Sequence, residues 1–77
     1  HLHHQATVLN NLGRAQQKLT NYGQALTSFS EAFEIAQKIG NKLLEGVVLI
    51  NIGENYALNS ATADALAYYC QALAILK

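Results

Sequence analysis

The sequence predicts an all-α protein made of two similar helical hairpins, stacked as a short α-solenoid. Apolar residues recur at helical spacing in four segments, and no stretch sustains the alternation of apolar and polar residues that a half-buried strand needs. The chain also nearly repeats itself at a spacing of 40 residues. Such a period is typical of stacked units that are each too small to bury their own apolar face. Units of this kind bind other molecules far more often than they catalyse reactions.

The internal repeat divides the chain into residues 1–40 and residues 41–77. When residues 1–37 are laid over residues 41–77, eight positions are identical. They are Val8/Val48, Leu9/Leu49, Asn11/Asn51, Gly13/Gly53, Ala25/Ala65, Leu26/Leu66, Ala32/Ala72 and Ile35/Ile75. We therefore expect two copies of one unit, which together form one small domain and a piece of a longer array.

The first hairpin is expected to consist of helices at residues 3–19 and 22–39. Apolar positions with helical spacing are Leu2, Ala6, Leu9, Leu12 and Leu19, followed by Tyr22, Ala25, Leu26, Phe29, Ala32, Phe33 and Ile39. Asn21 is a suitable N-cap for the second helix, with Gln24 three residues later. Gly40 is suited to the left-handed residue that closes this helix.

The second hairpin is expected to consist of helices at residues 43–58 and 62–77. Its apolar positions are Val48, Leu49, Ile52 and Tyr56, followed by Ala65, Leu66, Tyr69, Ala72, Leu73 and Leu76. Ser60 or Thr62 is expected to cap the last helix. The absence of proline leaves all the helices unbroken, and the short connections force neighbouring helices to be antiparallel.

The composition excludes several classes of function. Of the 77 residues, 51% are hydrophobic and 13% are charged, and the net charge is zero. A nucleic acid or an anionic membrane is therefore not an expected partner, because the basic surface that binds them is missing. The high apolar fraction suggests instead that some apolar surface is covered by a neighbour.

No catalytic, cofactor or metal site is predicted. The sequence contains no nucleophile–base–acid arrangement and no glycine-rich phosphate loop, so we do not expect an enzyme or a cofactor. His1, His3 and His4 have no cysteine or acidic residue nearby, which disfavours a specific metal site. Cys70 is the only cysteine. It is expected to be a buried, inert thiol in a reducing compartment, and we therefore favour the cytosol.

The spacing of small and apolar residues is the same in both units. Leu9, Leu12, Gly13, Ala25, Phe29 and Ala32 match Leu49, Ile52, Gly53, Ala65, Tyr69 and Ala72. This pattern resembles the tetratricopeptide repeat, and Tyr56 fills the tyrosine position of the second copy. The period of 40 and the missing closing proline resemble the long-repeat variant found in bacterial arrays, cyanobacterial ones above all. The glycines are expected to let helices approach closely, with the alanines opposite and the aromatic rings beside them.

The resemblance implies a right-handed superhelix whose concave groove is lined by the first helix of each repeat. It assigns to the groove Thr7, Asn10, Asn11, Arg14, Gln17 and Lys18, then Val47, Ile50, Asn51, Glu54 and Leu58. Asn11 and Asn51 are implied to hold the backbone of a bound peptide, although both could instead bond across the seam between helices. Arg14 and Lys18 could hold a carboxylate or could simply be solvated.

Two functions follow as expectations. The first is a scaffold that binds a peptide or a partner helix in the groove. The second is a structural unit that forms dimers or stacks through the last helix or the groove. The last helix must expose whichever of Tyr68, Cys70, Ile75 and Leu76 a further repeat would cover.

Overall fold

A computed structural model of the chain covers all 77 residues and consists of four α-helices with short connections. The helices are α1 (Leu2–Lys18), α2 (Tyr22–Lys38), α3 (Lys42–Leu58) and α4 (Thr62–Leu76). The all-α prediction is confirmed, and each helix begins and ends within one residue of its predicted boundary. No helix combines the length and the apolar composition that crossing a bilayer requires.

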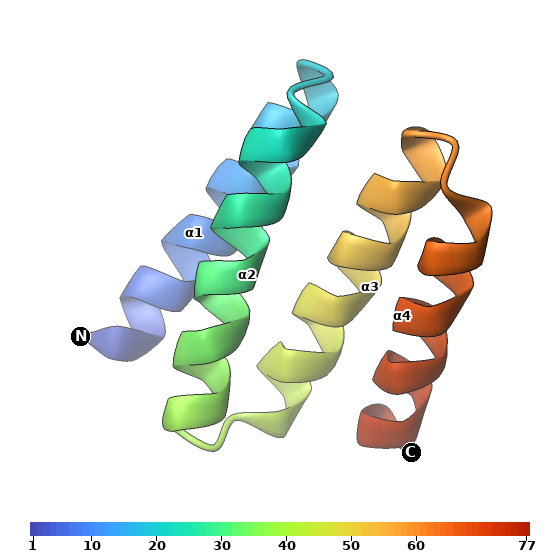
Figure 1. Cartoon of the computed structure of the whole chain (residues 1–77). Coiled ribbons are helices and arrows are strands. Elements are labelled where there is room, and N and C mark those ends of the chain that lie inside the picture. The colour runs from blue at the N-terminus through green and yellow to red at the C-terminus, as the bar shows by residue number, and fades with distance from the viewer.

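The helices pair as two antiparallel hairpins, α1 with α2 and α3 with α4, which lie side by side (Figure 1). α2 packs against α3 at the centre of the molecule, whereas α1 and α3 touch at only a few points. The Cα atoms therefore occupy a flat body that measures 33 × 27 × 13 Å. Because the chain reverses at each connection, α1 and α3 run in the same direction.

The core lies where α2 meets α3. Its buried members are Ala25, Phe29 and Ala32 on α2 with Val48 and Ile52 on α3. The alanines allow close approach because no long side chain separates the two helix backbones. Phe29 is the largest side chain that is fully buried, so it fills much of the interior of this small molecule.

Two glycines lie where an aromatic ring of the neighbouring helix covers the backbone. A Cβ atom built on Gly13 would lie 2.6 Å from Phe29 Cε1, and one built on Gly53 would lie 2.7 Å from Tyr69 Cε1. Both distances are far shorter than an ordinary van der Waals contact. The rings are therefore the closest partners of both glycines. At Gly53 the expected Ala65 comes next, with its carbonyl oxygen 3.1 Å from the built Cβ atom.

The three connections share one backbone conformation. In each, one residue is left-handed: Thr20 (φ 63°), Gly40 (φ 70°) and Ser60 (φ 65°). The next N–H donates to a carbonyl five residues back, as Asn41 N does to Ala36 O at 3.0 Å. The role predicted for Gly40 is confirmed. At Thr20 and Ser60 the same turn strains the backbone, because a Cβ atom disfavours the left-handed region.

The helix N-termini are capped less well than predicted. The Asn41 side chain accepts a hydrogen bond from a backbone N–H of the first turn of α3 at 3.0 Å. Asn21 occupies the predicted cap of α2 but makes no side-chain bond. The prediction of a Ser60 or Thr62 cap is wrong, because Ala61 is the N-cap residue of α4. Ser60 is used in the left-handed turn, and Thr62 is already helical.

Some residues expected to be buried are exposed, Leu12 and Cys70 among them. Leu12 occupies the position that corresponds to buried Ile52, but no helix covers it as α2 covers Ile52. Cys70 is an exposed thiol, so the prediction of a buried cysteine is wrong. Its counterpart in the first hairpin, Ser30, is exposed as well, which indicates that this side of the second helix faces solvent in both repeats.

Candidate partner-binding surface

Corresponding positions of α1 and α3 carry the residues predicted to bind a partner. Positions 7, 10, 11, 14 and 18 of α1 correspond to 47, 50, 51, 54 and 58 of α3, and within each helix they follow the spacing of one face. We call these ten positions the α1–α3 surface. The structure has two hollows, one between α1 and α2 and one between α2, α3 and α4. Neither is lined by any of the ten positions, so the α1–α3 surface is an open strip.

A hydrogen bond between two carboxamides joins α1 to α3 at this surface. Asn51 Nδ2 donates to Asn10 Oδ1 at 2.8 Å, and both residues are buried. The bond fixes the two helices in register where they otherwise barely touch. A buried amide pair that satisfies itself in this way avoids the desolvation penalty of an unpaired polar group.

The same pair still presents one donor and one acceptor. Asn10 Nδ2 and Asn51 Oδ1 make no hydrogen bond within the chain, and neither is among the polar atoms sealed from solvent without a partner. A peptide bond carries one N–H and one C=O. The pair could therefore accept from the N–H and donate to the C=O of a bound backbone.

Comparison with protein-family models identifies the repeat. The model for the tetratricopeptide repeat matches residues 4–77. The chain belongs to the tetratricopeptide repeat family. Tetratricopeptide modules are in general scaffolds for protein interactions and are not catalysts. No curated protein and no solved structure matches the chain.

The predicted site residues of this tetratricopeptide chain fall into two groups. The exposed group is Asn11, Arg14, Lys18, Val47, Ile50 and Glu54, and the flanking Thr7 and Leu58 are exposed too. The buried group is Asn10, Gln17 and Asn51. The exposed residues are free to contact a partner. Of the buried ones, Asn10 and Asn51 each keep one amide atom that is not sealed from solvent, whereas Gln17 Nε2 is sealed and has no partner.

Asn11 and Asn51 occupy the same repeat position but have different surroundings. Asn51 is buried and bonded to Asn10, whereas Asn11 is exposed. The difference arises because α1 lies beside α3, while no helix lies on the other side of α1. For Asn51 the structure therefore shows a hydrogen bond across the seam between α1 and α3. This is the alternative to peptide binding that the sequence left open.

The charged groups of the surface have no partner within the chain. The one ion pair of the structure joins Lys42 Nζ and Glu45 Oε2 at 3.4 Å, and it lies at the start of α3. Arg14 and Glu54 occupy equivalent positions of opposite charge, and neither is paired. The strip therefore has a basic side on α1, which includes Lys18, and an acidic group on α3.

Sequence reasoning missed a second polar link in the same seam. Asn55 Nδ2 donates to Tyr22 O at 3.0 Å and so ties α3 to the start of α2. Asn55 Oδ1 and Gln17 Nε2 are buried without partners. The signal was present, since Asn55 follows Asn51 by four residues and must lie near the same face.

One side-chain contact between the two helices of a hairpin differs between the two repeats. Ser28 Oγ donates to Gln16 Oε1 at 2.7 Å in the first hairpin. The corresponding pair in the second hairpin is Tyr68 and Tyr56, whose rings stack with centroids 5.3 Å apart. Burial raises the pKa of the Tyr56 phenol, and the neighbouring Tyr68 adds to the shift.

The three N-terminal histidines lie near one another at the start of α1. His4 lies near His1 and His3, with ring centroids 6.1 Å and 6.2 Å apart. No group of three or more histidine, cysteine, aspartate or glutamate side chains is placed to hold one ion. These rings instead lie near the edge of the first hairpin, where α1 begins.

Proposed function

We propose that the chain binds a protein or peptide partner along the α1–α3 surface and so serves as a scaffold module. The observation that carries the proposal is a strip of accessible groups of three kinds, none of which has a partner within the chain. They are the free amide atoms of Asn10 and Asn51, the charged Arg14, Lys18 and Glu54, and the apolar Val47 and Ile50.

Each kind of group would contribute a different part of recognition. The Asn10–Asn51 pair would bind the partner backbone whatever its sequence, with the exposed Asn11 carboxamide available beside it. Arg14 would favour an acidic side chain over α1, and Glu54 a basic one over α3. The apolar side chains on α3 would favour a partner with an apolar residue between these charges.

Selection from a random peptide library on the immobilised chain, followed by titration of the strongest peptide, tests the proposal. Lys18→Ala and Lys38→Ala form a matched pair. Both lysines lie in the last turn of a helix, but only Lys18 belongs to the α1–α3 surface. We expect Lys18→Ala and Glu54→Ala to weaken binding about three- to tenfold and Lys38→Ala to leave it unchanged. Failure to select any peptide, or equal effects of both lysine changes, would contradict it.

A second candidate function is self-association through α4. Apart from its ends, this helix exposes Leu66 and Leu73, although they belong to the face that corresponds to the buried side of α2. Ile75 and Tyr68 are half-buried, and Leu76 packs over Gly46 of α3. Of the groups expected from the sequence, Cys70 and Leu76 are exposed, and the exposed Leu66 and Leu73 add to them as groups that favour association.

A further inference from the structure

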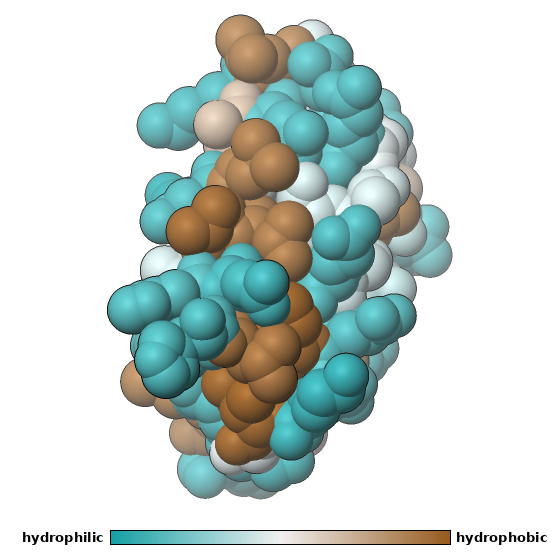
Figure 2. Space-filling model, turned by 90° about the vertical axis from the view of Figure 1, so that its left-hand side faces the viewer, coloured by the Kyte–Doolittle hydropathy of each residue, from teal (hydrophilic) through white to brown (hydrophobic).

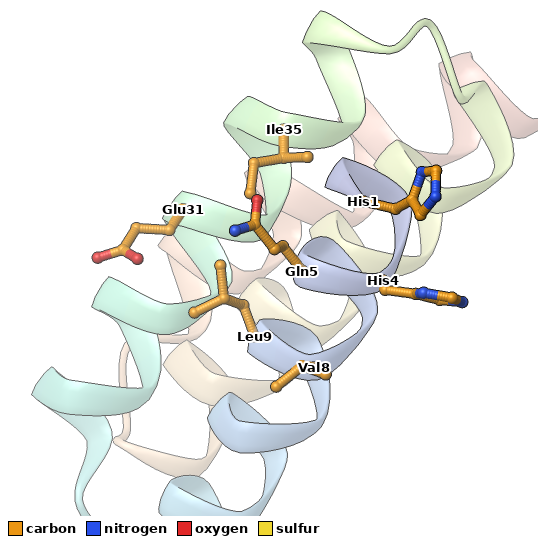
Figure 3. A pocket seen from close by; sticks show the side chains of 7 residues that line it. All are labelled: His1, His4, Gln5, Val8, Leu9, Glu31 and Ile35. Carbon is orange, nitrogen blue, oxygen red and sulfur yellow. The ribbon is translucent and has the colours of Figure 1, made fainter.

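The outer side of the first hairpin carries an apolar band with nothing packed on it. Figure 2 shows this band running along the side formed by α1 and α2, with hydrophilic atoms on both flanks. A hollow of about 540 Å³ lies on the same side between the two helices. Figure 3 shows its lining, which consists of the apolar Val8, Leu9 and Ile35 and the polar or charged His1, His4, Gln5 and Glu31, with Gln5 between Leu9 and Ile35.

The second hairpin contains the same band, but there it is covered. Val48 and Ile52 are 0% and 4% exposed, whereas their counterparts Val8 and Leu12 are 63% and 45% exposed. The difference is due to α2, which packs on α3 and buries the two residues in the core. α2 therefore shows what kind of surface covers the band.

The covering residues of α2 have uncovered counterparts on α4. Leu26 and Phe33 of α2 pack against the core. Phe33 also lines the second hollow, which lies between α2, α3 and α4, together with Leu49 and Ile52. Their counterparts on α4, Leu66 and Leu73, are 58% and 67% exposed. The outer side of α1 and the exposed face of α4 thus correspond to the two sides of the internal seam between α3 and α2.

We infer that a second copy of this chain covers the band, with α4 of one copy docked on the α1–α2 side of the next. In this arrangement Leu73 enters the hollow beside Leu9, as Phe33 lies beside Leu49 within one chain. The contact joins two different surfaces, so it propagates into open stacks and not into a closed symmetric dimer. Because the net charge is zero, there is little electrostatic repulsion between copies to oppose this contact. The inference rests on the second candidate function and not on peptide binding.

One polar contact of the internal seam would be missing between copies. Within a chain Asn51 donates to Asn10. Between copies the corresponding residues are Asn11 of the next copy and Ile50, which offers no acceptor. The contact between copies is therefore weaker than the internal seam, and Ile50→Asn should strengthen it.

Sedimentation of the 77-residue chain over a concentration series, from about 10 µM to about 1 mM, tests the arrangement. The wild type should grow beyond a dimer. Val8→Glu and Leu73→Glu should each weaken association at least about tenfold, because each places a carboxylate in the contact. An equimolar mixture of the two should form a 1:1 heterodimer, since each variant retains the surface that the other has lost. Leu43→Glu, at a leucine exposed outside both surfaces, is the matched control and should associate like the wild type.

The outcomes separate this arrangement from self-association in general. A wild type that stays monomeric throughout overturns both. Association that survives Val8→Glu but is lost in Leu73→Glu, without rescue in the mixture, indicates a symmetric α4 dimer and overturns only the head-to-tail arrangement. Ile50→Asn should tighten association about fivefold through the restored hydrogen bond. No tightening would contradict the proposed register.

Discussion

Replacing Gly13 by alanine is the most direct test of how the hairpins are held together. The added Cβ would lie 2.6 Å, 2.7 Å and 3.0 Å from three ring carbons of Phe29. Real Cβ atoms do not approach so closely, so the ring or the helix must move. Phe29 is fully buried in the core with Val48 and Ile52 of α3, so any movement of its ring must displace core neighbours.

Two opposing effects set the size of the change. Overpacking in a well-packed interior costs about 1–3 kcal/mol, and the rigid surroundings of Phe29 favour the upper part of that range. Alanine in place of glycine within a helix regains about 1 kcal/mol of helix propensity. We therefore expect Gly13→Ala to lower the free energy of unfolding by about 1–2 kcal/mol. Gly13→Leu should cost more, because its longer side chain has even less room.

Thermal unfolding followed by circular dichroism measures the effect. A loss of about 1–2 kcal/mol lowers Tm by about 5–15 °C for a domain of this size. Gly23→Ala is the matched control, because Gly23 is also helical but a Cβ there would meet nothing within 4 Å. It should melt at or slightly above the wild-type temperature. If Gly13→Ala also melts at or above that temperature, the ring is not a rigid neighbour and the packing argument is refuted.

Three further predictions concern the seam, the turns and the tyrosine stack. A double-mutant cycle of Asn10→Ala and Asn51→Ala in urea unfolding should give a coupling of about 1 kcal/mol, and additive effects would exclude a stabilising bond. Thr20→Gly and Ser60→Gly should each raise the free energy of unfolding by about 0.5–1 kcal/mol, as seen in Tm, because glycine relieves the left-handed strain; a fall in Tm for both would argue against that strain. The raised pKa of Tyr56 means that its protonated phenol contributes stability that is complete below about pH 10 and is lost as the pH rises through the folded-state pKa. Tyr56→Phe should therefore lose less stability than the wild type between about pH 9 and pH 11, and equal losses in urea titrations would contradict the assignment.

The fold could be predicted from the sequence because its main determinants are local. Helical spacing of apolar residues gave the four helices to within one residue, and short connections gave the antiparallel hairpins. The turn residue Gly40 was recognisable because glycine favours its conformation. Thr20 and Ser60 adopt the same conformation without any such signal, so the cap of α4 was misplaced by one residue.

The candidate surface was only partly predictable, because burial depends on which neighbour each helix face meets. The pattern placed Asn10, Gln17 and Asn51 on the predicted face, but only the structure separates the buried members from exposed Arg14 and Glu54. The bond between Asn10 and Asn51 spans 41 positions and depends on the offset between α1 and α3. Helical periodicity describes the faces of a single helix, so it does not predict the offset between two helices.

The exposure of the two ends was unpredictable for a related reason. Val8 and Val48 are identical and occupy the same repeat position, yet one is exposed and the other is fully buried. Sequence identity carries no information on whether a neighbouring helix is present. The same reason applies to Cys70. It was expected to be buried, but it is exposed because it lies on a side of α4 that no helix covers.

The central claim is that a partner binds along α1 and α3, and amide chemical-shift mapping tests it most directly. The probe is the strongest peptide from the library selection, titrated into the isotopically labelled 77-residue chain. We predict that the largest changes fall on Asn11, Arg14, Ile50 and Glu54 and on the side-chain amides of Asn10 and Asn51. Changes confined to α4, or to the hollow between α1 and α2, would contradict the claim.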